Sequence, residues 1–301
     1  MGIWRLAPGL FDRIQVNALQ EFSIGMLHGT SLDALQPIRD GGTPVLSRSS
    51  VTDIPATFVA DPFIHHFGGR WHMFFEIMHA AYRRGVIGLA SSDDAVDWTY
   101  ERVVLDEPFH LSYPYVFTFD GTPYMIPEAG RSGEVRLYRA AKYPYEWTLD
   151  RVLLEGAGYV DSSIFQRGDE WWLWTASPAS GGLALRLFWA DSPFGPWTEH
   201  PMSPVADHWS GTTRSAGRVI QVNGEILRFA QQAVPFYGTA VNRIRVDTLT
   251  KTRYAETLLP GSLLGPGEYD WNRDGMHHID AQVLNDGRVF ACVDGWRHGR
   301  I

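Results

Sequence analysis

Short apolar-rich runs alternate with turn residues along the chain, and one such arrangement recurs. Its first copy, residues 61–76, is an apolar-rich run, a Gly-Gly turn and a second apolar-rich run. Similar copies start at Tyr113 and Asp161, which gives a repeat length of roughly 50 residues. Two apolar-rich runs joined by a glycine-containing turn predict a β-hairpin. A repeat of this length is typical of a propeller or a solenoid.

Two weaker copies follow in the second half of the chain. Residues 216–231 contain an Asn223-Gly224 turn, and residues 279–294 contain an Asp286-Gly287 turn. Asn-Gly and Asp-Gly are the strongest short hairpin signals. The chain is therefore expected to contain five equivalent hairpins.

Further strand-like runs follow the hairpins, and a Trp-Thr pair recurs at residues 98–99, 147–148 and 197–198. Each unit then has four strands, as in a propeller blade. The last unit has only its first hairpin, but residues 21–32 resemble the missing third-strand run. The pattern predicts an all-β fold, a five-bladed β-propeller with four-stranded antiparallel blades, closed by strands from the N- and C-terminal parts of the chain. Such closure leaves no open sheet edge.

The same pattern predicts the domain organisation. Residues 1–20 are expected to form an N-terminal arm, and residues 21–301 to form the propeller. The blades are expected at about 58–105, 110–155, 158–205, 210–258, and 276–301 together with 21–50. Residues 259–275 are expected to be a long loop.

Composition excludes several classes of protein. The 45% hydrophobic and 20% charged content is ordinary for a globular protein. The net charge of −8, without a basic run, argues against nucleic acid as a partner. Cys292 is the single cysteine and cannot form an internal disulfide, and no zinc-type spacing exists. No stretch of 18 apolar residues and no signal-peptide pattern occurs, so we expect no membrane span and a cytoplasmic protein.

Acidic residues gather at two positions of the repeat. In a propeller the first strand of each blade lines the axis, so the ends of the hairpin predict which side chains meet there. The first position holds Asp61, Tyr113, Asp161, Ala216 and Ile279, and the last position holds Glu76, Glu128, Ala176, Gln231 and Asp294. Strands are depleted in Asp and Glu, and buried carboxylates are costly unless paired. The structural alternative is that these acids only bind neighbouring amides and arginines.

Basic and aromatic residues flank the same region. Arg214, Arg218, His277 and His278 could neutralise the acids or hold an anionic substrate, since arginine suits carboxylate or phosphate. His110 is expected near the axial mouth, and the many tryptophans offer sugar-stacking faces. The expected substrate-binding residues are Glu76, His110, Tyr113, Trp174, Arg214, Arg218, Gln231, His277, His278 and Asp294.

Neither a metal nor a cofactor is expected. The pairs His65-His66 and His277-His278 are the obvious candidate ligands. Adjacent residues of a strand point to opposite faces, so only one member of each pair is expected to face the axis.

Paired carboxylates suggest glycoside chemistry, in which one acid protonates the leaving oxygen and another serves as base or nucleophile. Like charges brought together raise one pKa, so that one partner stays protonated at neutral pH. The expected ligand is a carbohydrate or sugar-phosphate-like small molecule.

Individual motifs also resemble known families. Ala60-Asp-Pro-Phe resembles the start of blade one in the five-bladed glycoside hydrolase families 43, 62, 32 and 68. A closer similarity is to the N-terminal propeller of plant glucosamine inositolphosphorylceramide transferases and bacterial relatives, and it covers roughly residues 55–298. The motifs that carry it include His110-Leu-Ser-Tyr-Pro-Tyr, Tyr124-Met-Ile-Pro-Glu, Tyr159-Val-Asp-Ser-Ser, Arg214-Ser-Ala-Gly-Arg and His278-Ile-Asp.

The resemblance implies roles for three acids. By analogy with the hydrolases, Asp61 would be base or nucleophile, Glu128 the general acid and Asp161 the residue that tunes pKa. Glu128 departs from the hydrolase acid motif, because Ala-Gly follows it rather than Gly-Pro or Cys.

Three functions remain open at this point. The first is a carbohydrate-active enzyme of glycosidase or transglycosidase type. The second is a non-catalytic propeller that binds a glycan or sugar phosphate and assists a separate glycosyltransferase, the kind of domain that follows the propeller in the plant proteins. The third is a lyase or cyclase of small-molecule biosynthesis that uses the same acidic pocket.

Overall fold

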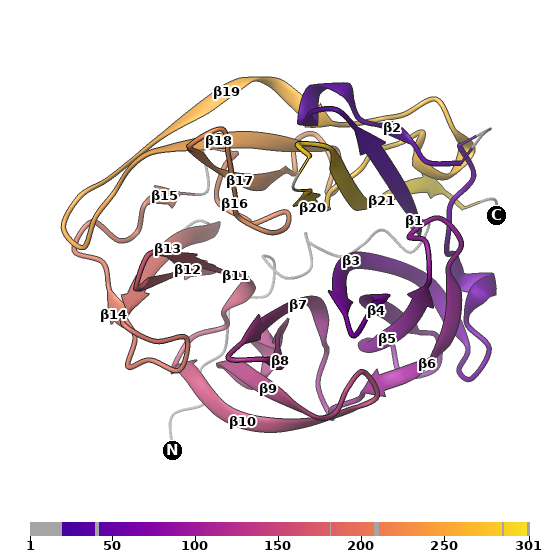
Figure 1. The fold of residues 1–301 in the computed structure, drawn as a ribbon, viewed down its shortest axis with the longest axis horizontal. Helices are drawn as coiled ribbons and strands as arrows, with labels where there is room; N and C mark the ends of the chain where they lie inside the picture. The colour runs from indigo at the N-terminus through magenta and orange to yellow at the C-terminus, as the bar shows by residue number, and fades with distance from the viewer. Residues whose placement is uncertain (1–19, 40–41, 181, 208–210, 285, 300–301) are drawn as a thin grey trace.

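The computed structural model describes residues 20–299 except 40–41, 181, 208–210 and 285, and these form a five-bladed β-propeller (Figure 1). Each blade is an antiparallel sheet, which confirms the predicted fold class. Of the predicted arm, residues 1–19 lie outside the described residues, and Gln20 already begins the first strand.

Four of the blades are consecutive in the chain. Blade I contains β3 (Ala56–Phe67), β4 (Arg70–His79), β5 (Arg84–Ser92) and β6 (Thr99–Leu105). Blade II contains β7 (Ser112–Phe119), β8 (Thr122–Glu128), β9 (Glu134–Lys142) and β10 (Glu146–Glu155). Blade III contains β11 (Val160–Arg167), β12 (Glu170–Ala179), β13 (Gly182–Ala190), β14 (Thr198–Glu199) and β15 (Ala206–Asp207). Blade IV contains β16 (Ile220–Val222), β17 (Glu225–Gln232), β18 (Ala240–Leu249) and β19 (Tyr254–Leu264).

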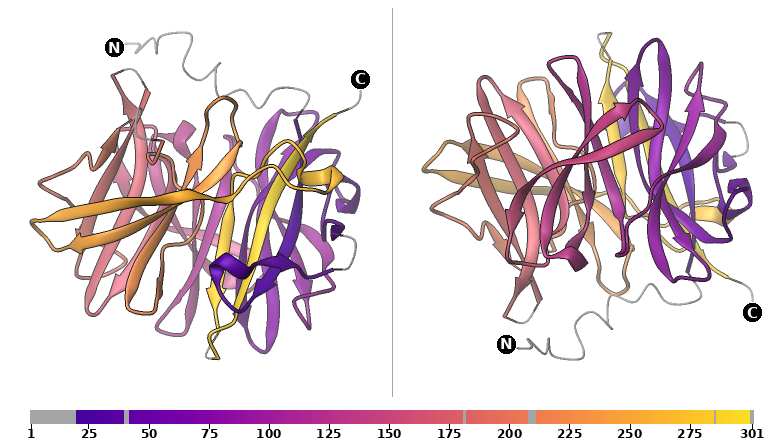
Figure 2. Two further views of the ribbon diagram at one scale, coloured as in Figure 1. Left: turned by 90° about the horizontal axis from the view of Figure 1, so that it is seen from above. Right: turned by 90° about the horizontal axis from the view of Figure 1, so that it is seen from below.

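Blade V is assembled from both parts of the chain. Its strand order is β2-β1-β21-β20, from β1 (Gln20–Gly29), β2 (Gln36–Pro37), β20 (Ile279–Val283) and β21 (Val289–His298). β1 pairs with β21 along its whole length, from Gln20 opposite His298 to Gly29 opposite Val289. Figure 2 shows the indigo and yellow strands side by side. The predicted closure is therefore confirmed.

The segments between strands contain short 3-10 helices. These are η1 (Leu32–Ala34), η3 (Arg48–Ser50), η4 (Gly130–Ser132) and η6 (Asp270–Asn272). Part of the loop expected at 259–275 is strand, because β19 continues to Leu264, and η6 lies in the remainder. No helix within the described residues is long and apolar enough to cross a membrane.

The hydrophobic core lies between blades. One buried cluster contains Trp172 and Leu187 of blade III together with Ile226 and Val246 of blade IV, and similar clusters join the other neighbouring blades. Alternating residues of each strand pack against the next blade in this way. Figure 1 shows β3, β7, β11, β16 and β20 nearest the axis, so the first strand of each blade positions the candidate site.

Candidate functional site

The first position of the repeat has an unusual backbone. Asp61, Tyr113 and Asp161 have φ angles of 51°, 46° and 50°, in the left-handed region that residues with a Cβ rarely adopt. At each of these positions the pairing of the first strand with the second slips, as in a β-bulge. A left-handed residue of this kind costs roughly 1–2 kcal/mol. The same costly conformation therefore recurs at the inner strand of three successive blades, next to the axis.

The residues around these bulges form one group, which we call the axial cluster. Its members are the buried acids at these positions and the residues packed around them: Asp61, Glu76, His110, Glu128, Asp161, Arg214, Gln231, Tyr237, His277 and Asp294. All five acids are less than 9% exposed, and Asp161 and Asp294 are fully buried. Apart from Tyr237, all members were candidate residues from the sequence.

Glu76 and Glu128 both lie close to one ring nitrogen of His110. Its Nε2 is 3.5 Å from Glu76 Oε1 and 3.7 Å from Glu128 Oε2. The N–H of Gly85 donates to His110 Nδ1 at 2.8 Å, so the neutral ring carries its proton on Nε2, toward the two carboxyls. Gly130 N–H donates to Glu128 Oε1 at 2.7 Å and fixes that carboxyl. The arrangement can hold a proton on either glutamate.

Asp161 is the acid that is paired with a cation. Arg214 Nε donates to Asp161 Oδ2, and Gln231 Nε2 donates to the same oxygen at 3.2 Å. The guanidinium lies 5.3 Å from the ring centre of Tyr237, a residue in the loop after β17. No repeat position or motif in the sequence marks Tyr237, because it depends on the path of a loop.

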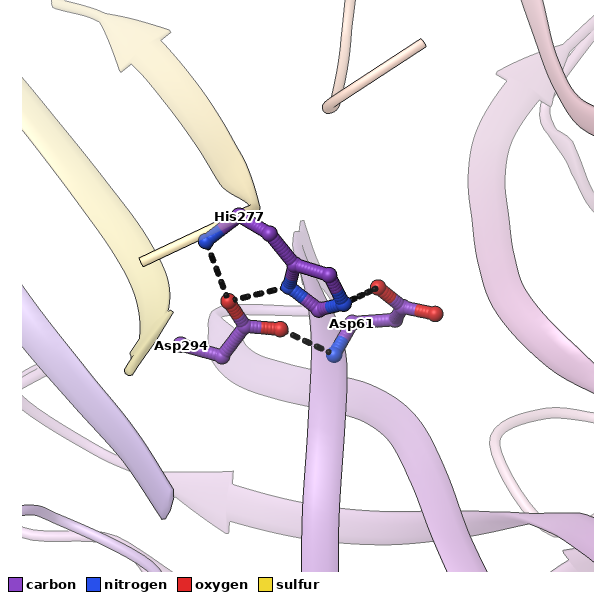
Figure 3. Close-up of side chains that lie close together, drawn as sticks. All are labelled: Asp61, His277 and Asp294. Carbon is purple, nitrogen blue, oxygen red and sulfur yellow. Dashed lines mark hydrogen bonds and ion pairs between the residues drawn. The ribbon is translucent and has the colours of Figure 1, made fainter. Parts of the chain in front are cut away.

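Asp294, His277 and Asp61 form a chain of polar contacts (Figure 3). Asp294 Oδ1 lies 2.7 Å from His277 Nδ1, and His277 Nε2 lies 3.8 Å from Asp61 Oδ1. The backbone N–H of Asp61 donates to Asp294 Oδ2 at 2.9 Å, which holds the bulge of blade I against blade V. Ligand-type atoms of the three residues lie within 4.8 Å of one another. N–H donors already occupy both oxygens of Asp294, so the geometry favours a chain of polar contacts over a cation cage.

The prediction that only one of His277 and His278 can face the axis is wrong. His278 Nδ1 is also 3.8 Å from Asp61 Oδ1, while its Nε2 lies 2.9 Å from the carbonyl oxygen of Pro62. These histidines precede β20 rather than lying in a strand, so the alternation of strand side chains does not apply. The other pair does lie in β3, where His65 contacts Tyr143.

The structure does not bring three of the predicted substrate-binding residues to free positions in the cluster. Arg218 is bound to Asp280, with Nε 2.7 Å from Oδ1. The hydroxyl of Tyr113 accepts the N–H of Gly217 at 2.7 Å and so links blade II to the segment before β16. Trp174 is fully buried in the core between blades III and IV.

Burial perturbs the acids that lack a cation. Burial is the largest cause that raises the pKa of Asp61 to about 7; His277 opposes it, and Asp294 and Asp161 add to it. Burial and then Asp161 raise the pKa of Glu128 to about 7. Burial, Asp61 and Glu128 together raise the pKa of Glu76 well above its usual range. Perturbed carboxyls of this kind are typical of acid–base sites.

Comparison with known proteins identifies the family. Residues 17–296 match the family described as glucosamine inositolphosphorylceramide transferase 1, N-terminal. Glucosamine inositolphosphorylceramide transferase 1 of Oryza sativa subsp. japonica is 36% identical over 92% of this chain and 40% of its own length. The Arabidopsis thaliana protein of the same name is 33% identical over 92% of this chain and 39% of its own length. The chain thus spans about 40% of the length of these curated relatives.

Solved structures share the fold at low sequence identity. A Bacteroides ovatus protein named xyloglucan PUL GH43B has a TM-score of 0.59 at 14% identity, covering 81% of this chain and 52% of its own. A family 117 glycoside hydrolase of Zobellia galactanivorans has a TM-score of 0.53 at 14% identity, covering 92% and 91%. These likenesses confirm the fold alone. The family match over most of the chain, together with the plant relatives, shows that this chain belongs to the glucosamine inositolphosphorylceramide transferase 1, N-terminal, family.

Proposed function

We propose that the axial cluster is a carbohydrate-active site of glycosidase or transglycosidase type. In this proposal Asp61 is base or nucleophile, Glu128 is the general acid and Asp161 tunes the pKa of both. The site would cleave or transfer a glycosidic bond by acid–base chemistry, without a metal or other cofactor.

The observation that carries the proposal is a set of buried acceptor oxygens without a donor. Asp61 Oδ1, Glu76 Oε1 and Gln231 Oε1 have no hydrogen-bond partner among the described residues. An unsatisfied buried acceptor costs about 1–3 kcal/mol, so three in one cluster call for a ligand that supplies donors. Sugar hydroxyls are such donors, and several of them lie on one ring.

The electrostatics support the assigned roles. Asp61 and Glu128, whose pKa values are both raised to about 7, can each exist as acid or base near neutral pH. Asp161 keeps Arg214 as its counter-ion, and its charge helps to raise the pKa of each of the other two. This is the behaviour expected of a tuning residue.

The test is turnover and binding by matched variants. Release of aryl leaving groups and of reducing sugar is measured on a panel of aryl glycosides and oligosaccharides. Asp61→Asn and Glu128→Gln are each expected to lower kcat about 10²–10⁴-fold while calorimetric affinity is retained. Asp93→Asn, whose side chain is 88% exposed, serves as the control. Unchanged turnover in either axial variant would sink the assignment.

A second candidate is binding of a glycan or sugar phosphate without turnover, in support of a glycosyltransferase. Family membership favours it, because the relatives are named transferases and this region is their N-terminal part. The pairing of Arg214 with Asp161 and of Arg218 with Asp280 counts against a strong phosphate grip. Affinity for a sugar that depends on Asp61 and Gln231, without turnover of any glycoside, would select this candidate.

A further inference from the structure

The polar chain in Figure 3 has a direction that follows from its donors and acceptors. Asp294 accepts N–H bonds from the backbones of His277, at 3.2 Å, and Asp61, at 2.9 Å. An ionised carboxylate only accepts, so the 2.7 Å contact requires a proton on His277 Nδ1. The neutral ring is then bare at Nε2, the atom that lies 3.8 Å from Asp61 Oδ1.

We propose that His277, oriented by Asp294, is the proton partner of Asp61, so that Asp61 and His277 share one exchangeable proton. The proposal rests on the proposed function only in taking Asp61 as the reacting carboxylate. His277 and Asp294 are positioning residues in this scheme, because both act through Asp61. The Oδ1 atom of Asp61 is buried and has no hydrogen-bond partner within the described part of the chain, so no hydrogen-bonded side chain competes with His277 for its proton.

The shared proton gives a balanced step. The O–H bond of water or an acceptor sugar breaks, and its oxygen uses the electron pair to bond the anomeric carbon. The released proton goes to Asp61 Oδ1 and from there to His277 Nε2, where the Asp294 carboxylate balances the imidazolium. The glycosidic C–O bond breaks with its electron pair on the leaving oxygen, which takes a proton from Glu128.

His278 is an internal comparison, since its Nδ1 lies at the same 3.8 Å from Asp61 Oδ1. Its Nε2–H donates to the carbonyl of Pro62, a neutral group, whereas His277 is backed by a carboxylate. Burial lowers the pKa of His278 to about 3. Distance to Asp61 alone therefore does not make a proton partner; the direct contact of His277 with the Asp294 carboxylate makes the difference.

The groups facing His277 agree with this assignment. Burial by itself lowers the pKa of His277, but Asp294 from β21 and Asp61 from β3 outweigh it, so the pKa lies above its ordinary value. Arg214 opposes them, and the ring of Tyr237 packs at 5.1 Å between ring centres. The site is therefore acidic enough to hold an imidazolium.

The first experiment needs no turnover. The full chain is labelled with ¹⁵N-histidine and titrated by NMR, in the wild type and in Asp61→Asn. We expect His277 to keep Nδ1 protonated throughout and to gain a proton on Nε2 as pH falls, while His278 stays neutral. Asp61→Asn should lower the midpoint of His277 by about one pH unit or more. A His277 that does not titrate, or a midpoint unchanged by Asp61→Asn, would overturn the proposal.

The second experiment measures the pH profile of turnover. The glutamine in His277→Gln can still donate a hydrogen bond to Asp294 but cannot take up a proton. This variant should lower kcat about 10²-fold and leave KM unchanged. It should also shift the limb of the pH–rate profile that reports the ionisation of Asp61. His28→Gln, at an exposed position outside the axial cluster, is the control. If Asp61→Asn abolishes turnover but NMR shows no coupling, only the relay fails. If NMR shows coupling but no glycoside is turned over, only the proposed function fails.

Discussion

Replacing Arg218 by methionine tests whether this residue fastens the blades together instead of binding substrate. Asp280 is fully buried and accepts donors from Arg218 at 2.7 Å and from the backbone of Ile64 at 2.8 Å. Arg218 also donates to the carbonyl of Val116 at 3.0 Å. These contacts join blades I, II and V to the segment that leads into blade IV. Arg218→Met would leave a buried carboxylate without its counter-charge, which costs about 3–5 kcal/mol.

A control of equal geometry separates burial from contact distance. Arg288 Nε also lies 2.7 Å from a carboxylate oxygen, on Asp286, but these side chains are 60% and 52% exposed. Because water screens an exposed pair, Arg288→Met is expected to lower the free energy of unfolding far less than Arg218→Met does. The same 2.7 Å contact should therefore differ several-fold in its contribution to the free energy of unfolding.

The assay is urea unfolding followed by tryptophan fluorescence. The double variant Arg218→Met/Asp280→Asn should be more stable than Arg218→Met by about 1–2 kcal/mol, because no uncompensated charge remains buried. An Arg218→Met loss no larger than that of Arg288→Met would refute the reasoning. A loss of sugar affinity at unchanged stability would instead restore the substrate-binding role predicted from the sequence.

Three further predictions follow from single contacts. Gly85→Ala would place its Cβ 2.8 Å from a Glu76 oxygen and against a backbone carbonyl, so it should lower both the urea midpoint of unfolding and the turnover rate. Gly158→Ala, whose Cβ would have no atom closer than 3.5 Å, is the control and should unfold at the wild-type midpoint. Tyr113→Phe leaves the buried backbone N–H of Gly217 without its acceptor and should lower the free energy of unfolding in urea by about 1–3 kcal/mol. A loss near zero would contradict this role of Tyr113. Folded Asp61 holds its proton to about pH 7, but the unfolded chain releases it near 3.8, so stability falls as pH rises through this window. Asp61→Asn should therefore gain stability over the wild type, on the order of 4 kcal/mol, above pH 7 but not below pH 4, because a pKa raised from 3.8 to about 7 is worth roughly that much. An equal difference at both pH values would contradict the pKa assignment.

Much of the fold could be predicted because its signals are local. Each hairpin carries its own turn residues, and the repeat length then implies blades and a closing strand pair. The ends of the hairpin also identified Asp61, Glu76, Glu128, Asp161 and Asp294, which the structure brings together. The equivalence of repeat positions was sufficient for this, since it depends on the alignment of the copies alone.

The remaining features of the site depend on contacts between distant segments. The side chain of Arg218 is near the axis as expected, but its partner Asp280 is 62 residues away in the chain. The loop that brings Tyr237 over Arg214 carries no repeat signal. His277 and His278 were assigned strand alternation, although their segment is not a strand. In each case the error concerns which neighbour a side chain meets, a question that the period of the repeat does not address.

The three left-handed bulges show how one position of the repeat acquires different chemistry. All share the same backbone, yet Tyr113 bonds to the main chain at Gly217, and Asp161 pairs with Arg214. Among the described residues, the side chain of Asp61 has neither kind of partner: its Oδ1 lies 3.8 Å from His277 and from His278 and accepts no hydrogen bond. The strain of roughly 1–2 kcal/mol is similar at each position, so it does not distinguish a reactive residue. The missing counter-ion does distinguish Asp61, and it supports the proposal that Asp61 is the acid that acts on a substrate.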